Sequence, residues 1–346
     1  MKPQVEPKMS SKIGILDFKK YLNIKEIDSF HLLIVQIISC FIFGISHPII
    51  TMTGSQGAAK STGGRLIRWL VDPAHADMVS LPTERRDLII QLNRGHMVFF
   101  DNIKNIKDDF NDIFCQAVTG GYQIARKLYT DDEIVAYKLQ RCMIMNGIID
   151  LTEKPDLLDR MISTKLERIN EKNTLYDQDL FAEFEQDLPY FLGSVFNVIS
   201  QAMSIYPNIT LERKPRMADF ARWGVAIATV LKIGGDNFMS EYFKNRNSIS
   251  LELIQDNATA IGIIDFMAQV NKGQWKGSVK DFWTELETFA IRKKINRDDK
   301  TWAKTENVLG KRLEELKVSL EQQGVYFDKR NIGTNKELTI KYVKKQ

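Results

Sequence analysis

The chain has 346 residues, which is long enough for two domains that each have a hydrophobic core. Hydrophobic residues make up 44% and charged residues 27%, as in ordinary globular proteins, which excludes a collagenous, low-complexity or broadly disordered chain. The formal net charge is +4, but residues 291–346 hold 15 Lys and Arg against 8 Asp and Glu, a local +7 that leaves −3 elsewhere. This basic end predicts an anionic partner, with a solvated lysine-rich tail as the alternative.

The three cysteines lie far apart, and the four histidines do not cluster in the sequence: Cys40, Cys115, Cys142, His31, His47, His75 and His96. This arrangement predicts neither a disulfide framework nor a zinc site, and it favours a reducing, cytoplasmic location. Residues 29–48 are about long enough to span a membrane, but polar side chains interrupt them and a glycine-rich loop follows closely. We therefore expect a buried helix at 30–45 and no membrane association. The first residues lack the hydrophobic stretch of a signal peptide.

The apolar pattern then predicts strands alternating with helices. Strands are expected at 48–53, 77–81, 96–101, 141–146 and 161–166, with helices that begin near residues 60 and 83. Such alternation is typical of an α/β fold whose parallel sheet is flanked by helices. Ligands of these sheets bind at the carboxyl ends of the strands, where Gly54, Asp101 and Asn146 fall.

The second half of the chain reads as mostly helical. Residues 178–245 have apolar side chains at helical spacing, which predicts a helical lid, and another helix is expected at 251–270. Helices at 278–289 and 304–322, followed by strand-like runs at 325–328 and 337–343, predict a winged helix. We therefore expect four parts: a polar N-terminal segment (1–27), an α/β core (28–176), a helical lid (177–250) and a winged-helix-like domain (251–346).

The segment 54–61 matches the Walker A pattern at every defined position except one. Glycines let the backbone approach phosphates, and the following helix offers exposed N–H groups and the positive end of its dipole. Lys60 is predicted to reach the outer phosphates and Ser61 to ligate Mg²⁺. The predicted ATP-binding residues are Gly54, Ser55, Gln56, Gly57, Ala58, Ala59, Lys60, Ser61 and Thr62. An ordinary strand-to-helix turn is the alternative.

Ala59 is the departure, because the pattern has glycine at this position. A methyl group is tolerated there at a negative, helical φ but is costly at a positive φ. The loop alone therefore predicts only that a nucleotide binds, within a P-loop NTPase fold.

An apolar strand that ends in an acid, residues 97–101, follows about forty residues later, which is the Walker B arrangement. Asp101 is predicted to hold the Mg²⁺ together with Ser61. Its neighbour is Asn102, where many such ATPases have a glutamate that activates water. An amide can orient water but is a poor base, so hydrolysis is either slow or served by another acid, for which Glu84 is a candidate. A capping role at the strand end is the alternative for Asp101.

Two further positions complete the predicted catalytic set. Asn146 ends an apolar strand, which fits a sensor of the γ-phosphate or of water; a turn before Gly147 is the alternative. Arg160 precedes the last core strand and is predicted to reach the γ-phosphate of a neighbouring subunit, which requires an oligomer. A surface ion pair with Asp156 or Asp159 is the alternative for Arg160.

In this order the motifs resemble the P-loop ATPase–helicase module of replication proteins from phages, plasmids and integrated elements. These modules are similar to superfamily 3 and AAA+ helicases and are often fused to a primase–polymerase. The resemblance covers residues 18–245 and includes TGSQGAAKST, LPTERRDL, VFFDNI, AVTGGYQIARKLYTDDE, MNGI, PDLLDR and KPRMADFARWG. It implies an ATP- and Mg²⁺-dependent DNA helicase that acts as a homo-oligomeric ring on single-stranded or forked DNA. A primase or another replication protein is a candidate partner.

The resemblance also carries the inference to nucleic acid. In superfamily 3 helicases the segment similar to residues 117–128 forms a hairpin in the central channel, so Arg126 and Lys127 are candidate DNA contacts. The alternative is a β-turn with solvated basic residues. In the predicted winged helix, Lys311 and Arg312 are expected near DNA phosphates, and docking to a protein is the alternative. Because of Ala59 and Asn102, an ATP-gated adaptor with little hydrolysis stands as the second hypothesis.

Overall fold

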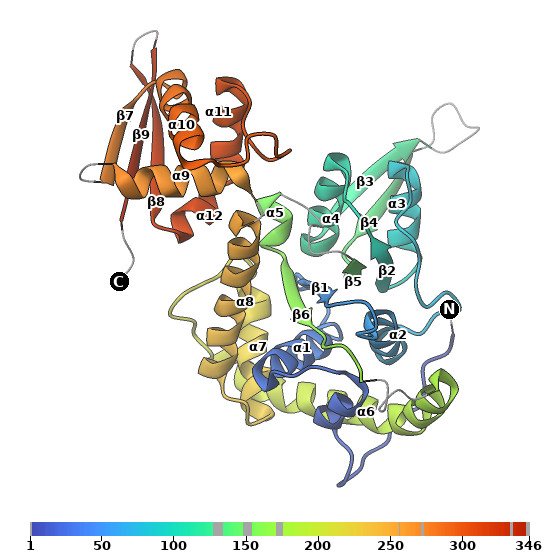
Figure 1. Ribbon diagram of the computed structural model, residues 1–346. Coiled ribbons are helices and arrows are strands. Elements are labelled where there is room, and N and C mark those ends of the chain that lie inside the picture. The colour runs from blue at the N-terminus through green and yellow to red at the C-terminus, as the bar shows by residue number, and fades with distance from the viewer. Residues whose placement is uncertain are drawn as a thin grey trace. The chain divides into compact units, whose positions relative to one another are not determined.

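A computed structural model describes residues 2–126, 134–147, 154–170, 176–255, 257–270, 273–332 and 335–343. The chain forms two compact units (Figure 1). The first comprises residues 1–152 and 159–245, and the second comprises residues 153–158 and 246–346. The boundary falls within one helix, α8 (Gly235–Gln255), which begins in the first unit and ends in the second.

The centre of the first unit is a parallel sheet in the order β2-β5-β1-β6. Its strands are β1 (Ile49–Thr53), β2 (Met97–Ile103), β5 (Cys142–Gly147) and β6 (Met161–Lys165). Ile50 pairs with Ile144 of β5 on one side and with Ile162 of β6 on the other. The strands are near-continuous apolar runs and are buried, as expected for a parallel sheet covered on both faces. The predicted α/β fold with a parallel sheet is confirmed.

Helices cover this sheet. α2 (Lys60–Val71) packs on β1, β2 and β5, and α1 (Ile27–Ser39) packs on β6. α1 is the apolar segment that composition alone would allow to be a membrane span. Its Leu33, Ile34 and Ile37 are fully buried, which confirms the prediction of a buried helix.

A second group of elements packs beside β2 (Figure 1). It contains α3 (Arg85–Asn93), α4 (Asp108–Thr119) and an antiparallel hairpin of β3 (Gly121–Arg126) and β4 (Ile134–Leu139). The strand predicted at 77–81 is wrong: only Val79 forms a bridge there, to Phe100 of β2.

The first unit ends in helices α6 (Asp177–Ile205), η3 (Tyr206–Asn208), α7 (Ala218–Val230) and the start of α8. The N-terminal segment, predicted to be polar, packs onto them through η1 (Ile15–Tyr21). The fully buried Phe18 ring lies edge-on against Phe184 and Phe191 of α6, with ring centroids 5.7 and 5.5 Å apart. The segment is therefore part of the core.

Among the described residues, one helical stretch, residues 177–208, is long and apolar enough to cross a membrane on length and composition alone. About 39% of its most apolar window is buried within the protein, and core helices of globular proteins meet the same criterion.

The second unit contains α5 (Pro155–Leu158), α9 (Ala258–Gln269), β7 (Gln274–Gly277), α10 (Val279–Lys293), α11 (Glu306–Glu315), α12 (Lys317–Gln322), β8 (Val325–Ile332) and β9 (Asn335–Tyr342). The antiparallel sheet has the order β7-β9-β8, and the helices pack on it around a core of Phe282, Trp302 and Leu313. The predicted single helices over 251–270 and 304–322 are each interrupted, near Asn257 and at Leu316.

Candidate functional site

The glycine-rich loop joins the carboxyl end of β1 to the first turn of α2. Gly54 and Gly57 have positive φ angles of 139° and 83°. A side chain on Gly54 would collide with the backbone carbonyl of Leu166, so this position has room only for glycine. The exposed residues Ser55, Gln56 and Gly57 lead into the start of α2, and the first N–H groups of a helix have no partner within the helix. The loop therefore presents backbone donors at a helix N-terminus, an arrangement that binds anions.

Ala59 adopts the left-handed conformation, with φ 55° and ψ 34°, immediately before α2. Of the two backbone conformations considered from the sequence, this is the unfavourable one for a residue that carries a Cβ. The left-handed region costs an alanine about 1–2 kcal/mol relative to a right-handed one. The loop thus keeps a conformation suited to glycine while carrying a methyl group.

Lys60 folds back over the loop. Its Nζ donates to the carbonyl oxygens of Gly54 at 2.8 Å and Ser55 at 3.0 Å. The ammonium group therefore lies against the backbone of the loop that is predicted to bind phosphates. The same contact bridges the two ends of the turn.

Asp101 lies at an irregularity of β2. The pairing of β2 with β5 shifts register between Phe100 and Ile103, which inserts an additional residue into β2. Such bulges redirect side chains at strand ends. Asp101 is half-buried there, and its Oδ1 accepts a hydrogen bond of 2.8 Å from the Ser61 hydroxyl at the start of α2. The two predicted metal ligands, separated by 40 residues in sequence, therefore meet.

Asn146 connects these groups from the end of β5, where its side chain is 3% exposed. Its Nδ2 donates to Asp101 Oδ1 at 2.5 Å and to Ser61 Oγ at 3.2 Å, while its Oδ1 accepts from the Asn102 N–H at 2.7 Å. The donor and acceptor types of these neighbours fix the orientation of the amide. The side chain predicted to sense the γ-phosphate thus holds the aspartate in place.

Asn102 is the second residue of the bulge and has a positive φ of 56°. Asparagine is among the few residues that adopt this conformation readily, which gives a local reason for its presence. Its backbone N–H is bound to Asn146, and its side chain is exposed.

The donor set suits a hard cation. A hydroxyl oxygen and a carboxylate oxygen lie together beside the glycine-rich loop, and Mg²⁺ prefers oxygen ligands of these types. The residues predicted to hold Mg²⁺ and phosphate therefore form one continuous group, from Gly54 through Ser61 to Asp101 and Asn146.

The arginine predicted to reach a neighbouring subunit lies elsewhere. Arg160 is 7% exposed, so within this chain it does not project from the surface.

Sequence reasoning missed Arg168, which follows β6 and is exposed. Its Cγ and Nε lie 3.8 Å from the position that a Gly57 Cβ would take, and the neighbouring Ile169 N–H donates to the Gly57 carbonyl at 3.2 Å. Only the basic character of the segment after the last core strand could have indicated it.

The hairpin predicted from the resemblance is present as β3 and β4. Gln123 faces the body of the unit and accepts a hydrogen bond from Arg85 at 3.1 Å. Tyr122 and Ile124 face the opposite way and are 63% and 71% exposed. Lys138 pairs with Tyr122 across the hairpin. Of the predicted DNA contacts, Arg126 is the last residue of β3, and Lys127 lies outside the described residues.

The aromatic and basic surface continues beyond the hairpin. The Lys138 ammonium lies 5.9 Å from the centre of the Phe43 ring, which is 86% exposed. We refer to Phe43, Tyr122, Ile124 and Lys138 as the hairpin patch.

In the second unit, the two predicted DNA contacts on α11 differ. Lys311 is exposed. The Arg312 guanidinium lies 3.8 Å from the Glu315 carboxylate and within 3.5 Å of the Lys300 carbonyl, so it is engaged within the chain.

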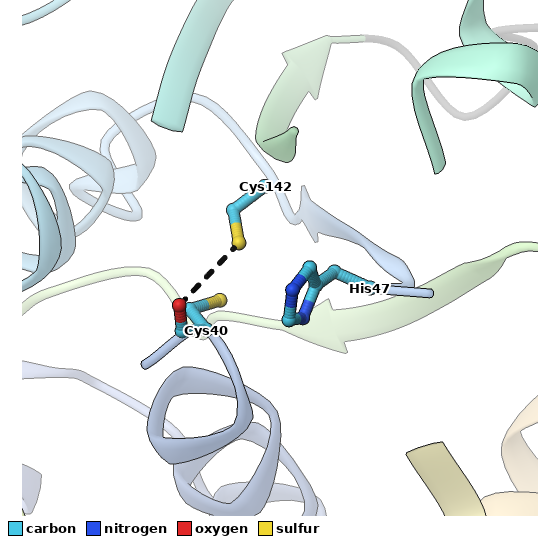
Figure 2. A group of neighbouring side chains, drawn as sticks. All are labelled: Cys40, His47 and Cys142. Atoms are coloured by element: carbon cyan, nitrogen blue, oxygen red, sulfur yellow. Dashed lines mark hydrogen bonds between the residues drawn. The ribbon is translucent and has the colours of Figure 1, made fainter. Parts of the chain in front are cut away.

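Four cysteine and histidine residues that lie far apart in the sequence come together in the fold. Cys40 ends α1, His47 precedes β1, and Cys142 opens β5; their ligand atoms all lie within 4.8 Å of one another (Figure 2). His96 precedes β2, with its Nε2 3.5 Å from the Cys142 sulfur. The sheet brings together the starts of strands that are far apart in sequence.

Comparison with models of known protein families identifies the family of this chain. The model of the actinomycete integrative conjugative element replication protein matches residues 16–239. This chain belongs to that family. A second family model, that of the RepA C-terminal domain of these elements, matches residues 259–346. The two matches fall largely within the first and second units, so the replication-protein family accounts for both.

No curated protein matches this family member. Among solved structures, the apo C-terminal region of NrS-1 is similar with a TM-score of 0.45 and 11% identity, covering 99% of this chain and 80% of that one. A second apo structure of that region, residues 305–718, gives a TM-score of 0.46 with 9% identity, covering 99% and 79%. These TM-scores are too low to support an inference.

Proposed function

We propose that this replication protein is an ATP- and Mg²⁺-dependent motor that acts on DNA, a helicase of the P-loop class. The observation that carries the proposal is the 2.8 Å hydrogen bond between Ser61 and Asp101 beside the glycine-rich loop. A hydroxyl at the start of the helix and a carboxylate at the end of a neighbouring strand are the pair that holds Mg²⁺ in this class.

Each residue of the group has a distinct task in this proposal. The N–H groups of the loop and of the first turn of α2 donate to phosphate oxygens, and Lys60 transfers its hydrogen bonds from Gly54 and Ser55 to the outer phosphates. Ser61 and Asp101 supply oxygen ligands to Mg²⁺, and Asn146 holds Asp101. The bound Mg²⁺–ATP supplies a phosphoanhydride whose hydrolysis drives the motor. Arg168, beside Gly57, adds positive charge next to the phosphates.

The hairpin patch supports a nucleic-acid substrate. Aromatic side chains on an exposed surface stack with unpaired bases, and a nearby lysine attracts the backbone. Tyr122, Lys138 and Phe43 offer this combination on the β3–β4 hairpin and beside it. We propose that this patch, together with the sequence-predicted contacts Arg126 and Lys127, contacts single-stranded or forked DNA.

The second unit is proposed to be a winged helix that binds DNA. A helix–strand–helix–helix–helix–hairpin order with the sheet β7-β9-β8 supports this interpretation. Lys311 is free to approach phosphates, whereas Arg312 would first have to leave Glu315. A ring of copies and a replication partner such as a primase also belong to the proposal, as does a cytoplasmic site of action. Mass measurement with and without nucleotide tests the ring.

The proposal is tested by ATP hydrolysis with Mg²⁺ and single-stranded DNA. Lys60→Ala and Asp101→Ala should each reduce turnover roughly 10²–10³-fold, as expected when one fixed charge at the reacting phosphates is lost. Lys25→Ala, which removes an exposed lysine of the same unit, is the matched control and should keep full activity. Equal hydrolysis by Lys60→Ala and Lys25→Ala would refute the assignment.

A second candidate function is an ATP-gated adaptor that turns over little. The exposed Asn102 side chain favours it, because the position after Asp101 carries an amide and no base. Single-turnover hydrolysis with and without single-stranded DNA separates the two. Tight ATP binding without hydrolysis in either condition would favour the adaptor.

A further inference from the structure

The four side chains Cys40, His47, His96 and Cys142, here called the Cys–His cluster, have no part in the proposed ATP site. They lie at the amino ends of the strands, whereas the glycine-rich loop follows the carboxyl end of β1. His47 comes just before β1, His96 just before β2, and Cys142 is the first residue of β5. The cluster therefore needs an explanation of its own.

Three members of the cluster are deeply buried. Cys40 and His47 are 2% exposed and Cys142 is 1% exposed. Figure 2 shows the two thiols and the imidazole pointing into one common space. The Nδ1 atom of His47 is buried and has no hydrogen-bond partner among the described residues. A buried polar nitrogen without a partner is costly and indicates a ligand that the protein atoms do not supply.

The spacing of the donor atoms suits a small tetrahedral ion. With Zn–S bonds of about 2.3 Å and Zn–N bonds of about 2.0–2.1 Å, neighbouring ligand atoms lie roughly 3.4–3.8 Å apart. The His96 Nε2 and the Cys142 sulfur are 3.5 Å apart, and the atoms of Cys40, His47 and Cys142 lie within 4.8 Å. A contraction of about 1 Å would complete the geometry.

The surroundings favour a cation and allow it to enter. Cys40 caps the carboxyl end of α1, where the helix dipole is negative. Its carbonyl oxygen accepts a hydrogen bond of 2.7 Å from the His96 Nε2–H, which holds His96 beside the cluster; a metal ion bound at this nitrogen would replace that hydrogen bond. His96 is the exposed member and provides a path from solvent to the buried thiols.

We propose that the Cys–His cluster binds one Zn²⁺ ion through the thiolates of Cys40 and Cys142 and the imidazole of His47, with His96 as the fourth ligand. Binding releases the two thiol protons to solvent, leaves the His96 ring proton on Nδ1 and not on Nε2, and involves no change in oxidation state. Four protein ligands leave no open position, so the ion is structural: it ties the end of α1 to the starts of β1, β2 and β5. The inference is independent of the proposed ATPase activity.

The test uses the full chain, reduced and freed of metal, and titrated with Co²⁺ as a spectroscopic substitute. We expect one equivalent to bind with thiolate-to-cobalt charge-transfer absorption, and Zn²⁺ to displace it. Cys40→Ser and Cys142→Ser should each weaken or abolish this absorption. Cys115→Ser removes the third cysteine, which is buried in α4 outside the cluster, and should leave the absorption unchanged. No charge-transfer band in the wild-type chain, or an unchanged band in both cluster variants, overturns the proposal.

A measurement on the wild-type chain covers the case in which the variants do not fold. Native alkylation followed by mass spectrometry should show that Zn²⁺ slows modification of Cys40 and Cys142 but not of Cys115. Equal modification rates with and without Zn²⁺ overturn the proposal. A second result would also overturn it. This is a Cys40–Cys142 disulfide in protein purified without reductant, together with no metal uptake once that disulfide is reduced.

Discussion

Nδ2 of Asn146 lies 2.5 Å from Oδ1 of Asp101, and this hydrogen bond joins the ends of the neighbouring strands β5 and β2. The same amide group reaches Ser61 on α2 and the backbone of Asn102. One buried side chain therefore fixes the position of both proposed Mg²⁺ ligands. In metal sites such supporting contacts orient the ligands and adjust the affinity for the ion.

Asn146→Ala should therefore act mainly through Mg²⁺. Without the amide, Asp101 loses its support, and we expect the apparent Mg²⁺ affinity or the turnover to fall roughly 10–100-fold. The measurement is ATP hydrolysis as a function of Mg²⁺ concentration. Asn208→Ala, which removes an exposed amide at the end of η3, is the control. A variant with a normal Mg²⁺ dependence but weaker ATP binding would instead assign Asn146 to the nucleotide.

Asn102→Asp tests whether hydrolysis lacks a base. Aspartate tolerates the positive φ of 56° at this position and introduces a carboxylate next to Asp101. If the base is missing, turnover should rise, by at most about 10²-fold, because general-base catalysis contributes 10²–10⁴-fold when well placed. The rate is compared with that of Glu84→Gln. A fall in Glu84→Gln with no gain in Asn102→Asp would identify Glu84 as the base.

Ala59→Gly should stabilise the chain. The left-handed conformation at φ 55° is unfavourable for alanine and natural for glycine. The variant relieves about 1–2 kcal/mol of backbone strain in the folded state. This gain is larger than the cost of the additional conformational entropy that a glycine loses on folding, so the free energy of unfolding should rise by up to about 1 kcal/mol. Denaturant unfolding measures it. Ala58→Gly, at a buried position without a positive φ, should instead destabilise the protein. The same sign for both variants would contradict the argument.

Tyr122→Ala should weaken binding of single-stranded DNA. Stacking of one base on an aromatic ring contributes about 1–3 kcal/mol, so the dissociation constant should rise roughly 5–150-fold. Fluorescence anisotropy with a labelled oligonucleotide at fixed salt measures the effect. Tyr176→Ala, which removes an 82% exposed tyrosine away from the hairpin, should bind normally. Equal binding by both variants would remove the hairpin patch from the DNA contacts.

Phe18→Ala tests the role of the N-terminal segment in the core. Truncating a fully buried aromatic residue costs about 3–5 kcal/mol of unfolding free energy. Phe43→Ala, at an 86% exposed position of the same unit, should cost far less. Thermal unfolding of both variants measures the difference. Similar losses would indicate that η1 detaches without cost to the core.

The sequence predicted the structure well where the pattern lies within a single strand or loop. Apolar runs that end in a glycine, an acid or an amide located β1, β2 and β5 to within a few residues. The site residues followed, because parallel strands bring such ends together. β7 and α4 were missed. β7 has four residues, mostly polar, and depends on pairing with β9, so its own pattern is too short to indicate a strand.

Interactions between distant segments were beyond sequence reasoning. Cys40 and Cys142 are 102 positions apart, and only the order of strands in the sheet shows that they meet. The bulge at Asp101 and the support from Asn146 likewise depend on pairing between strands. The break between α11 and α12 falls at Leu316. A leucine gives no sign of a helix break, as a glycine or proline at this position would have done.

The hydrogen bonds of Lys60 to Gly54 and Ser55 have a consequence for nucleotide exchange. Without a ligand, the lysine already has partners, so an arriving phosphate gains only the difference between two sets of contacts. These bonds hold the shape of the loop, and the proposed nucleotide would have to replace them, which would lower its affinity. In the proposed motor, the carbonyl oxygens of Gly54 and Ser55 would take up the Lys60 ammonium again when the product leaves, which would ease product release in every cycle.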